Sequence, residues 1–279
     1  MLTSIQHPGI LRIIQANVAE RWFVTDYYPR GTLAGSLLKY RGEALKALRA
    51  FRTIVEAVAE LHSRGYVHRD IKPPNIFLDG DNQLVLGDFG IVFFEDRERT
   101  RLTSSFEKVG STNWMAPWAH MGIRVDDVRP SFDVFSLGKL LWAMVSGQQI
   151  LPPYYTHRSP EFALEKLFPD RRDIEEVNSI LDKCIVTDER NCFDSAIRLR
   201  DAVARAIEIL ERPEQATLKQ VVLSTPDGNF RVLITASPFQ VDATPLTRNE
   251  KGDWQPQASA KGPLIRWHHE PNGQLFRKH

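Results

Sequence analysis

Residues 67–78 read Val-His-Arg-Asp-Ile-Lys-Pro-Pro-Asn-Ile-Phe-Leu, and residues 88–90 read Asp-Phe-Gly. Each short motif is weak evidence by itself, since an isolated His-Arg-Asp is usually a turn with a surface ion pair and an isolated Asp-Phe-Gly is usually a loop. Here they occur in order, with a predicted hairpin over 75–86 between them and an amphipathic helical pattern from Glu43 to Leu61 before them. The combination is specific enough to decide the fold.

The two motifs resemble the catalytic and metal-binding loops of the protein kinase family. The first matches His-Arg-Asp, four residues and Asn, and the second begins eighteen residues after Asp70. The Lys-Pro-x-Asn pattern that starts at Lys72 is similar to Ser/Thr kinases rather than to tyrosine kinases. The resemblance extends over about residues 7–212 and implies that the γ-phosphate of ATP is transferred, with Mg²⁺, to a Ser or Thr hydroxyl of a protein substrate.

On this resemblance, each polar residue of the two loops takes a role that suits its chemistry. Hard cations take oxygen ligands, so Asn75 and Asp88 are the expected Mg²⁺ ligands. A carboxylate within hydrogen-bond reach of the attacking hydroxyl accepts its proton, which makes Asp70 the candidate base. Lys72 is expected to place positive charge beside the transferred phosphoryl group, and His68 is expected to be mainly a packing residue.

The segment before these loops, residues 23–33, resembles the fifth strand and hinge of the family. Thr25 then stands at the gatekeeper position. Asp26 and Tyr28 are expected to offer backbone groups to the adenine of ATP, and Phe77 is expected to lie beneath the adenine ring.

A polar stretch between Asp88 and Pro117 resembles the activation segment of the family. Its hydroxyl residues are expected to be regulatory, because a phosphate added there supplies acceptor oxygens for the guanidinium of Arg69. These hydroxyl residues are Thr100, Thr103, Ser104, Ser105 and Ser111. The alternative is an ordinary exposed loop.

Three parts of a complete kinase have no counterpart in the sequence. They are the glycine-rich loop over the phosphates, the strand Lys that binds the phosphates and the helix Glu that holds this Lys. No two of the 16 glycines stand two residues apart, so Gly-x-Gly does not occur. The first Lys, Lys39, lies beyond the hinge, and the first Glu, Glu20, lies between the two opening strands. We therefore expect an N-terminally incomplete chain with little or no turnover. The alternative is a catalytically inactive, pseudokinase-like binding scaffold.

The upper lobe is then reduced to a remnant ribbon of two strands, predicted at 10–15 and 21–28. A two-stranded ribbon is only marginally stable alone, so its apolar residues are expected to stay partly uncovered and to contact a partner. These residues are Ile10, Leu11, Ile13, Ile14, Trp22, Phe23 and Val24.

A further departure lies at Trp118, where the Ala-Pro-Glu motif of the family would place its Glu. Arg190 of the later Asp-Glu-Arg motif then lacks its expected partner. Because an unpaired buried guanidinium costs about 3–5 kcal/mol, we expect another acid or a stacked Trp118 ring to serve it. Asp188 and Glu189 are too close in sequence to be obvious choices.

The fold class expected is α+β: a protein kinase-like fold with a mainly helical lower lobe, a remnant two-stranded upper lobe and a β-rich C-terminal extension. The kinase-like domain is placed at 1–212, with the remnant and hinge at 1–33 and the lower lobe at 34–212, and the extension at 213–279. Helical patterns in the lower lobe lie at 133–146, 173–185 and 194–210, and hairpins in the extension at 220–235 and 264–276. The role of the extension cannot be read.

The composition of the 279 residues excludes several classes of function. With 42% hydrophobic and 25% charged residues and a net charge of +1, the chain is an ordinary folded protein without a global field for nucleic acid or anionic lipid. Cys184 and Cys192 support neither a disulfide framework nor a zinc site, and the apolar runs are too short to span a bilayer. We expect a cytoplasmic protein that binds neither nucleic acid nor membrane.

Overall fold

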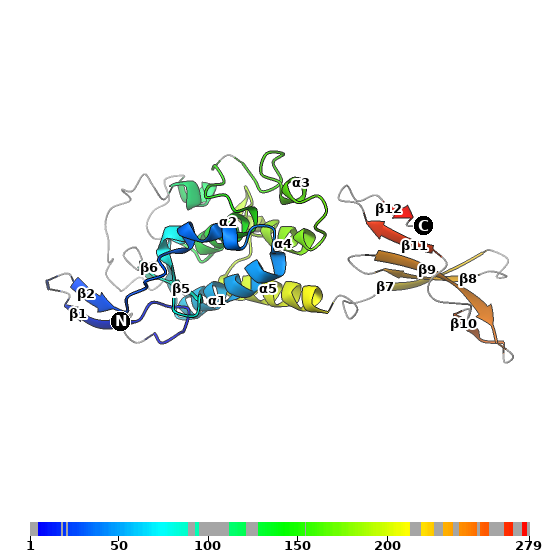
Figure 1. The fold of residues 1–279 in the computed structure, drawn as a ribbon, viewed down its shortest axis with the longest axis horizontal. Coiled ribbons are helices and arrows are strands. Elements are labelled where there is room, and N and C mark those ends of the chain that lie inside the picture. The colour runs from blue at the N-terminus through cyan, green and yellow to red at the C-terminus, as the bar shows by residue number, and fades with distance from the viewer. Residues whose placement is uncertain are drawn as a thin grey trace. The chain divides into compact units, whose positions relative to one another are not determined.

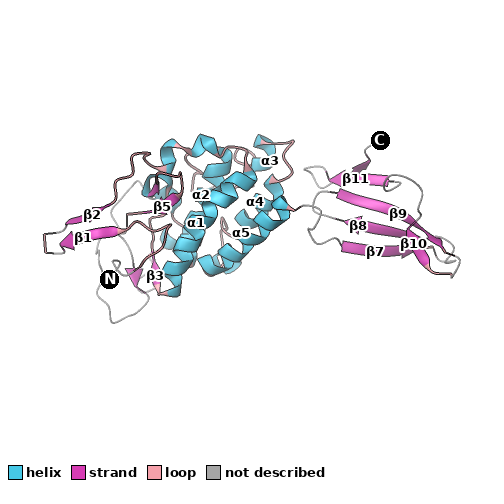
Figure 2. Ribbon diagram, turned by 60° about the horizontal axis from the view of Figure 1, so that its bottom comes forward, coloured by secondary structure: helices cyan, strands magenta, loops and turns pink. Residues whose placement is uncertain are grey.

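The computed structural model describes residues 5–17, 19–20, 22–88, 93–94, 112–120, 128–153, 155–212, 219–225, 231–236, 240–249, 252–256, 265–269 and 275–277. Its contacts divide the chain into two compact units, Met1–Ile207 and Glu208–His279. The first unit contains helices and two-stranded ribbons (Figure 1), and the second contains a sheet (Figure 2). This mixture of helices and small sheets agrees with the predicted fold class.

The helices and strands of the first unit follow the predicted order. They are β1 (Ile13–Asn17), β2 (Trp22–Thr25), α1 (Ala44–Ser63), β3 (Tyr66–Val67), β4 (Ile76–Leu78), β5 (Leu84–Leu86), β6 (Phe93–Phe94), α2 (Ser131–Ser146), α3 (Leu164–Leu167), α4 (Ile174–Leu181) and α5 (Ala196–Glu211). Single 3₁₀ turns are η2 (Leu33–Gly35), η3 (Leu37–Lys39), η4 (Pro73–Asn75), η5 (Thr112–Trp114), η6 (Pro117–His120) and η8 (Glu189–Asn191). The helix predicted to reach residue 185 ends at Leu181, and α3 was not predicted.

Helices α1 and α2 form the centre of the first unit. In α1, Leu48, Phe51 and Val55 recur at steps of three and four and are fully buried, so the predicted periodicity marks the core face. In α2 every residue except Phe132 is buried. The polar side chains of a helix that is buried on all sides must form hydrogen bonds within the protein. Those of α2 therefore bind the surrounding loops.

The predicted hairpin between the two motifs is confirmed, because β4 and β5 pair antiparallel with Ile76 opposite Leu86. The opening ribbon differs in its start: β1 begins at Ile13, since Ile10 forms a bridge to Leu86 and the Leu11 N–H donates to the Leu86 carbonyl at 2.8 Å. The residues expected at the start of the ribbon therefore belong to the edge of the β4–β5 hairpin.

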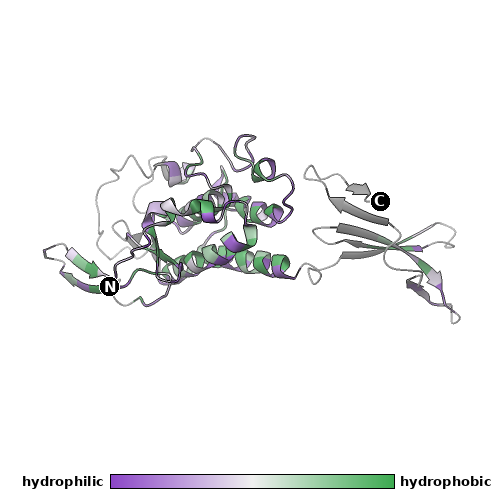
Figure 3. Cartoon of the chain, viewed as in Figure 1, coloured by the Kyte–Doolittle hydropathy of each residue, from purple (hydrophilic) through white to green (hydrophobic). Residues whose placement is uncertain are grey.

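The expectation that Ile10 and Leu11 are uncovered is wrong, because they are only 6% and 8% exposed. The remainder of the ribbon does stay uncovered, and its apolar strands are visible in Figure 3. Exposed fractions there are 55% for Ile14, 58% for Phe23 and 44% for Val24. Within the segment predicted as the ribbon, the exposed apolar side chains thus lie on β1 and β2.

The second unit is an antiparallel sheet in the order β12-β11-β9-β8-β7, with β10 paired to β9. Its strands are β7 (Lys219–Ser224), β8 (Arg231–Ala236), β9 (Gln240–Arg248), β10 (Trp254–Pro256), β11 (Ile265–His269) and β12 (Leu275–Arg277). Both predicted hairpins are present, β7–β8 and β11–β12. Strand β9 was not predicted; it contains Pro245, opposite Val232 of β8, although Pro is uncommon within central strands.

In the part of the chain that the structure describes, no helix combines the length and the apolar character that crossing a bilayer requires.

Gly138 of α2 provides a test of this core. A Cβ at residue 138 would lie 2.4 Å from the Cβ of Cys184, which has no flexible end to move aside. We expect Gly138→Ala to lower the free energy of unfolding by about 1–3 kcal/mol, measured by urea unfolding followed by circular dichroism. Gly80→Ala, whose Cβ meets open space, is the control. Equal stability of Gly138→Ala and the control would contradict this packing.

Candidate functional site

Two predicted catalytic residues, Asp70 and Lys72, and the predicted metal ligand Asn75 form one hydrogen-bonded cluster between β3 and β4. The Nζ of Lys72 donates to both carboxylate oxygens of Asp70, at 2.8 Å each. The Nδ2 of Asn75 donates to the Asp70 carbonyl and to Asp70 Oδ2, also at 2.8 Å. The Asp70 carboxylate is 4% exposed and is oriented from two sides. A carboxylate that is held in one orientation can accept a proton from a hydroxyl placed beside it.

The two predicted metal ligands are held close through the backbone. The Gly87 N–H donates to the Asn75 carbonyl at 2.9 Å, which ties the residue before Asp88 to Asn75. Asp88 is exposed and has a left-handed φ of 55°, a conformation that Asp tolerates better than most residues. Since the Asn75 amide nitrogen is engaged with Asp70, its amide oxygen is the atom left for a hard cation. The pair therefore fits Mg²⁺.

The loop that carries this cluster is attached to α1 and α2 through the carboxylate of Asp133. It accepts from the His68 N–H and the Arg69 N–H at 2.7 Å each, and it lies 2.9 Å from His62 Nε2. The Ala196 N–H donates to His62 Nδ1, so Nε2 carries the proton and donates to Asp133. Burial opposes ionisation of this carboxyl, but the hydrogen bonds prevail and the pKa of Asp133 lies below its ordinary value.

His68 connects the catalytic loop to the start of the Asp-Phe-Gly motif. Its Nδ1 accepts from the Asp70 N–H at 3.3 Å, so the proton is on Nε2, which donates to the Gly87 carbonyl at 3.0 Å. The ring is fully buried, and burial lowers its pKa. The predicted packing role of His68 is confirmed, and its two hydrogen bonds also place Asp70 and Asp88 relative to each other.

The three residues predicted to bind adenine lie in one region. The rings of Tyr28 and Phe77 are stacked, with centroids 5.3 Å apart. The Asp26 side chain forms an ion pair with Arg12 at 3.1 Å, and the Asp26 carbonyl accepts from the Thr25 hydroxyl at 2.9 Å. A Cβ on residue 87 would lie 2.5 Å from the Phe77 ring, so a larger residue than glycine would require that ring to shift.

A pocket of about 410 Å³ adjoins this segment, and Asp26 and Tyr28 are among its lining residues. It also contains Asp79 and Val85 of the β4–β5 hairpin, but neither Asp70 nor Asp88. The pocket therefore does not coincide with the hydrogen-bonded cluster at Asp70.

The regulatory residues are only partly within the described structure. Arg69 is half-buried with a φ of 71°, and burial lowers its pKa. Its left-handed backbone is held by the hydrogen bond to Asp133. The predicted regulatory hydroxyls Thr100, Thr103, Ser104, Ser105 and Ser111 lie outside the described residues.

Arg190 is not buried, contrary to expectation, because its side chain is 89% exposed. Its guanidinium pairs with Asp188 at 2.5 Å, the residue judged too close in sequence. Hydrogen bonds from Arg190 lower the pKa of Asp188 to about 2. Trp118 does not stack on Arg190; it contacts the Phe135 ring of α2 edge to face, with centroids 5.5 Å apart.

Glu189 connects the late motif to α2 in place of Arg190. Its carboxylate accepts from the Ser131 hydroxyl at 2.6 Å and from the Arg129 guanidinium at 3.0 Å. In this contact the acidic residue, Glu189, lies on η8, and the basic residue, Arg129, lies before α2. The resemblance implied the reverse, with the basic residue Arg190 on η8 and its acidic partner at the position of Trp118.

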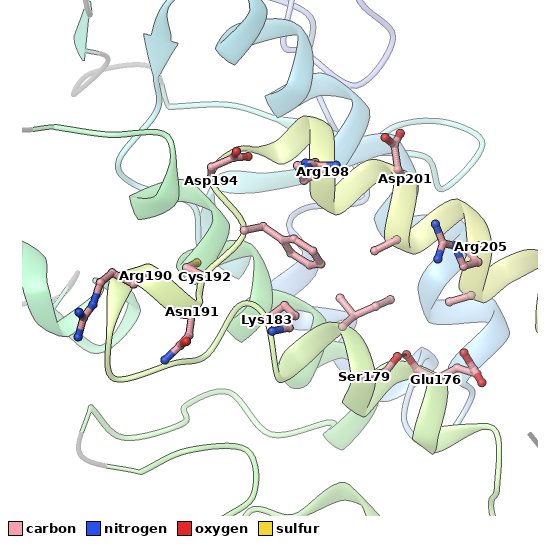
Figure 4. Close-up of a pocket in the computed structure, with 14 residues that line it drawn as sticks. Glu176, Ser179, Lys183, Arg190, Asn191, Cys192, Asp194, Arg198, Asp201 and Arg205 are labelled. Carbon is pink, nitrogen blue, oxygen red and sulfur yellow. Dashed lines mark hydrogen bonds between the residues drawn. The ribbon is translucent and has the colours of Figure 1, made fainter.

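A second pocket, of about 790 Å³, lies between α4, η8 and α5 (Figure 4). Basic residues such as Lys183, Arg198 and Arg205 alternate there with acidic residues such as Glu176 and Asp201. The pocket contains no residue of the two motifs. Its mixed charge does not identify a ligand.

Sequence reasoning missed the role of His62. The signal was available, because His62 follows Ile54 and Val58 at steps of four on the buried face of α1. A histidine at such a position is buried and needs polar partners, here Asp133 and the Ala196 N–H.

Residues 1–199 match the family model described as Protein kinase domain. Similar curated proteins include serine/threonine-protein kinase CHK1 of Saccharomyces cerevisiae, 33% identical over 51% of this chain and 28% of that protein. The SIK3 homolog of Danio rerio, a serine/threonine-protein kinase, is 34% identical over 53% of this chain and 12% of that protein. CBL-interacting serine/threonine-protein kinase 19 of Arabidopsis thaliana is 26% identical over 69% of this chain and 40% of that protein.

With the motifs, their geometry and the family match in agreement, the chain belongs to the protein kinase family. Its named relatives are of the Ser/Thr class. The matched region spans between 12% and 40% of the length of these three relatives.

The Asp133 carboxylate gives a pH-dependent prediction. Its folded-state pKa is lowered, so its stabilisation is present above the unfolded value of 3.8 and is lost as the pH falls through the folded value. We expect Asp133→Asn to cost about 1–3 kcal/mol at pH 7, because an amide leaves one buried N–H unsatisfied, and to cost less at pH 3. Urea unfolding at both pH values measures this, with Asp170→Asn on the exposed surface as control. A cost that does not change with pH would contradict the assignment.

The exchanged roles of Glu189 and Arg190 can be tested in the same assay. We expect Glu189→Ala to cost about 1 kcal/mol, since two hydrogen bonds to the start of α2 are lost. Arg190→Ala should change the unfolding free energy by less than about 0.5 kcal/mol, because its ion pair is exposed. A larger loss in Arg190→Ala than in Glu189→Ala would show that the arrangement is wrong.

Proposed function

We propose that this chain is the catalytic part of a Ser/Thr protein kinase, which transfers the γ-phosphate of ATP to a Ser or Thr hydroxyl of a protein substrate. The observation that carries the proposal is the orientation of the Asp70 carboxylate by Lys72 and Asn75, beside the tied pair Asn75 and Asp88. Mg·ATP supplies the phosphoryl group and the cations that neutralise its charge.

Each residue of the cluster has a separate role in the proposed reaction. Asp70 accepts a hydrogen bond from the substrate hydroxyl, points its oxygen in line with the phosphoryl group and takes up the proton. Lys72, 2.8 Å from that carboxylate, places its ammonium where negative charge develops. The Asn75 amide oxygen and the Asp88 carboxylate hold the metal, and the stacked Tyr28 and Phe77 rings offer an apolar surface to the adenine.

The domain division belongs to the same proposal. We place the kinase domain at 1–212, with 1–33 as its upper part and hinge, and we treat 213–279 as a separate β-rich extension. Supporting this, the contacts divide the chain between Ile207 and Glu208, near the end of α5.

A second candidate function is a non-catalytic binding module. The observation that favours it is the apolar surface of β1 and β2, where Ile14, Phe23 and Val24 are 44–58% exposed. A partner covering this ribbon would bury apolar area on both of its faces.

A thermal-shift titration with Mg·ATP distinguishes the two candidates. For a kinase we expect saturable stabilisation of the 279-residue chain, lost in Asp88→Asn because one metal ligand is removed. Asp81→Asn is the matched control, since Asp81 is an exposed aspartate in the β4–β5 turn. Absence of a shift in the unmutated chain would favour the binding module.

A catalytic readout separates binding from chemistry. Where a longer protein that contains this chain transfers phosphate to a Ser/Thr peptide, Asp70→Asn should abolish the transfer while the Mg·ATP shift persists. Transfer at the original rate in Asp70→Asn would remove Asp70 from the role of base.

A further inference from the structure

Helix α2 presents hydrogen-bond donors on successive turns to carbonyls outside the helix. The Ser136 hydroxyl donates to the Trp114 carbonyl at 2.8 Å, and the Trp142 Nε1 donates to the Phe162 carbonyl at 2.9 Å. Lys139, between them, donates to the Leu151 carbonyl at 2.9 Å and also to the Asn113 carbonyl. Lys139 is therefore the member of this set that contacts two separate segments.

The environment of Lys139 is unusual for a charged group. The residue is 1% exposed, and its ammonium lies 5.4 Å from the centre of the Phe135 ring. Among the described residues no carboxylate lies within ion-pair distance of it. Within this described part of the chain, two backbone carbonyls and a ring face surround the ammonium.

The charged groups of the elements around α2 are engaged elsewhere. Asp133, on the same helix, is bound by His62 of α1. Glu165 of α3 and Asp182 after α4 are both bound by Arg158. Lys39 of η3 is exposed. Burial is accordingly the cause of the lowered Lys139 pKa, about 8 instead of 10.5.

We propose that Lys139 is a positioning residue that couples the Thr112–Trp114 turn to the loop at Leu151, so that the two segments open and close as one unit. One ammonium donates to a carbonyl of each segment, so the departure of either segment brings water to the buried donor that both segments share. This deepens the proposed function, because η5 lies near the end of the predicted activation segment. The coupling itself requires neither ATP nor catalysis.

Proton linkage gives the coupling a measurable signature. Opening hydrates Lys139 and returns its pKa from about 8 toward 10.5. Below pH 8 the amine is protonated in both forms, so the opening free energy is independent of pH. Between pH 8 and 10.5 opening takes up a proton, and the closed form gains stability as the pH rises. Protection of both segments must therefore increase above pH 8.

Hydrogen exchange of the 279-residue chain, read by mass spectrometry from pH 6.5 to 9.5 and corrected for intrinsic rates, tests this. We expect peptides containing Asn113 and peptides containing Leu151 to share one opening free energy. Above pH 8 the opening constant of both should fall, approaching tenfold per pH unit, while peptides from α1 stay unchanged. Unequal or pH-independent opening of the two segments in the unmutated chain overturns the proposal.

The matched variant is Lys139→Met, which keeps the length of the side chain and removes its ammonium. We expect the two segments to exchange with different free energies and without the rise in protection above pH 8. Lys166→Met, an exposed lysine of α3, should behave as the unmutated chain. A Lys139→Met chain whose two segments still share one pH-dependent opening would also overturn the proposal. If that variant does not fold, the profile of the unmutated chain decides. Because the assay contains no nucleotide, its result is independent of the Mg·ATP titration.

Discussion

The geometry of the candidate site depends on one buried carboxylate, that of Asp133. It accepts hydrogen bonds from His62 of α1 and from the backbone N–H groups of His68 and Arg69. These bonds hold Arg69 in a left-handed conformation that its side chain alone would disfavour. They therefore determine the direction in which the Asp70 side chain leaves the backbone. A short polar loop with no regular structure of its own is positioned by the helices beneath it.

The same principle applies along the rest of α2. A helix buried on every side leaves its polar side chains no water, so each must find a partner in the protein. Ser136 and Trp142 each bond the carbonyl of a neighbouring segment, and Lys139 bonds two. These hydrogen bonds satisfy the side-chain donors of α2 and also the carbonyls of the loops around it, which would otherwise be buried without hydrogen bonds. The central helix thus acts as the frame to which these loops are attached.

Where sequence reasoning failed, it had assigned contacts that depend on more than one element. Arg190 was assigned a buried position by resemblance, yet it lies on the surface with Asp188, and Glu189 makes the contact to α2. Ile10 was grouped with the ribbon by its apolar character, yet its neighbour is Leu86. In each case the residue type was compatible with several partners. The choice among them depended on which backbone segment lay within reach.

The sequence by itself determined the order and kind of the main elements around the two motifs, because periodicity and turn residues act locally. The α1 helix, the β4–β5 hairpin and α2 follow from local patterns, and the family resemblance of the two motifs placed Asp70, Asn75 and Asp88 in two nearby loops. Only the tertiary structure decided which nitrogen of His62 carries its proton, that Glu189 rather than Arg190 holds the start of α2, and that Lys139 is buried between two carbonyls. These are properties of residues far apart in the chain, and local spacing carries no information about such distances.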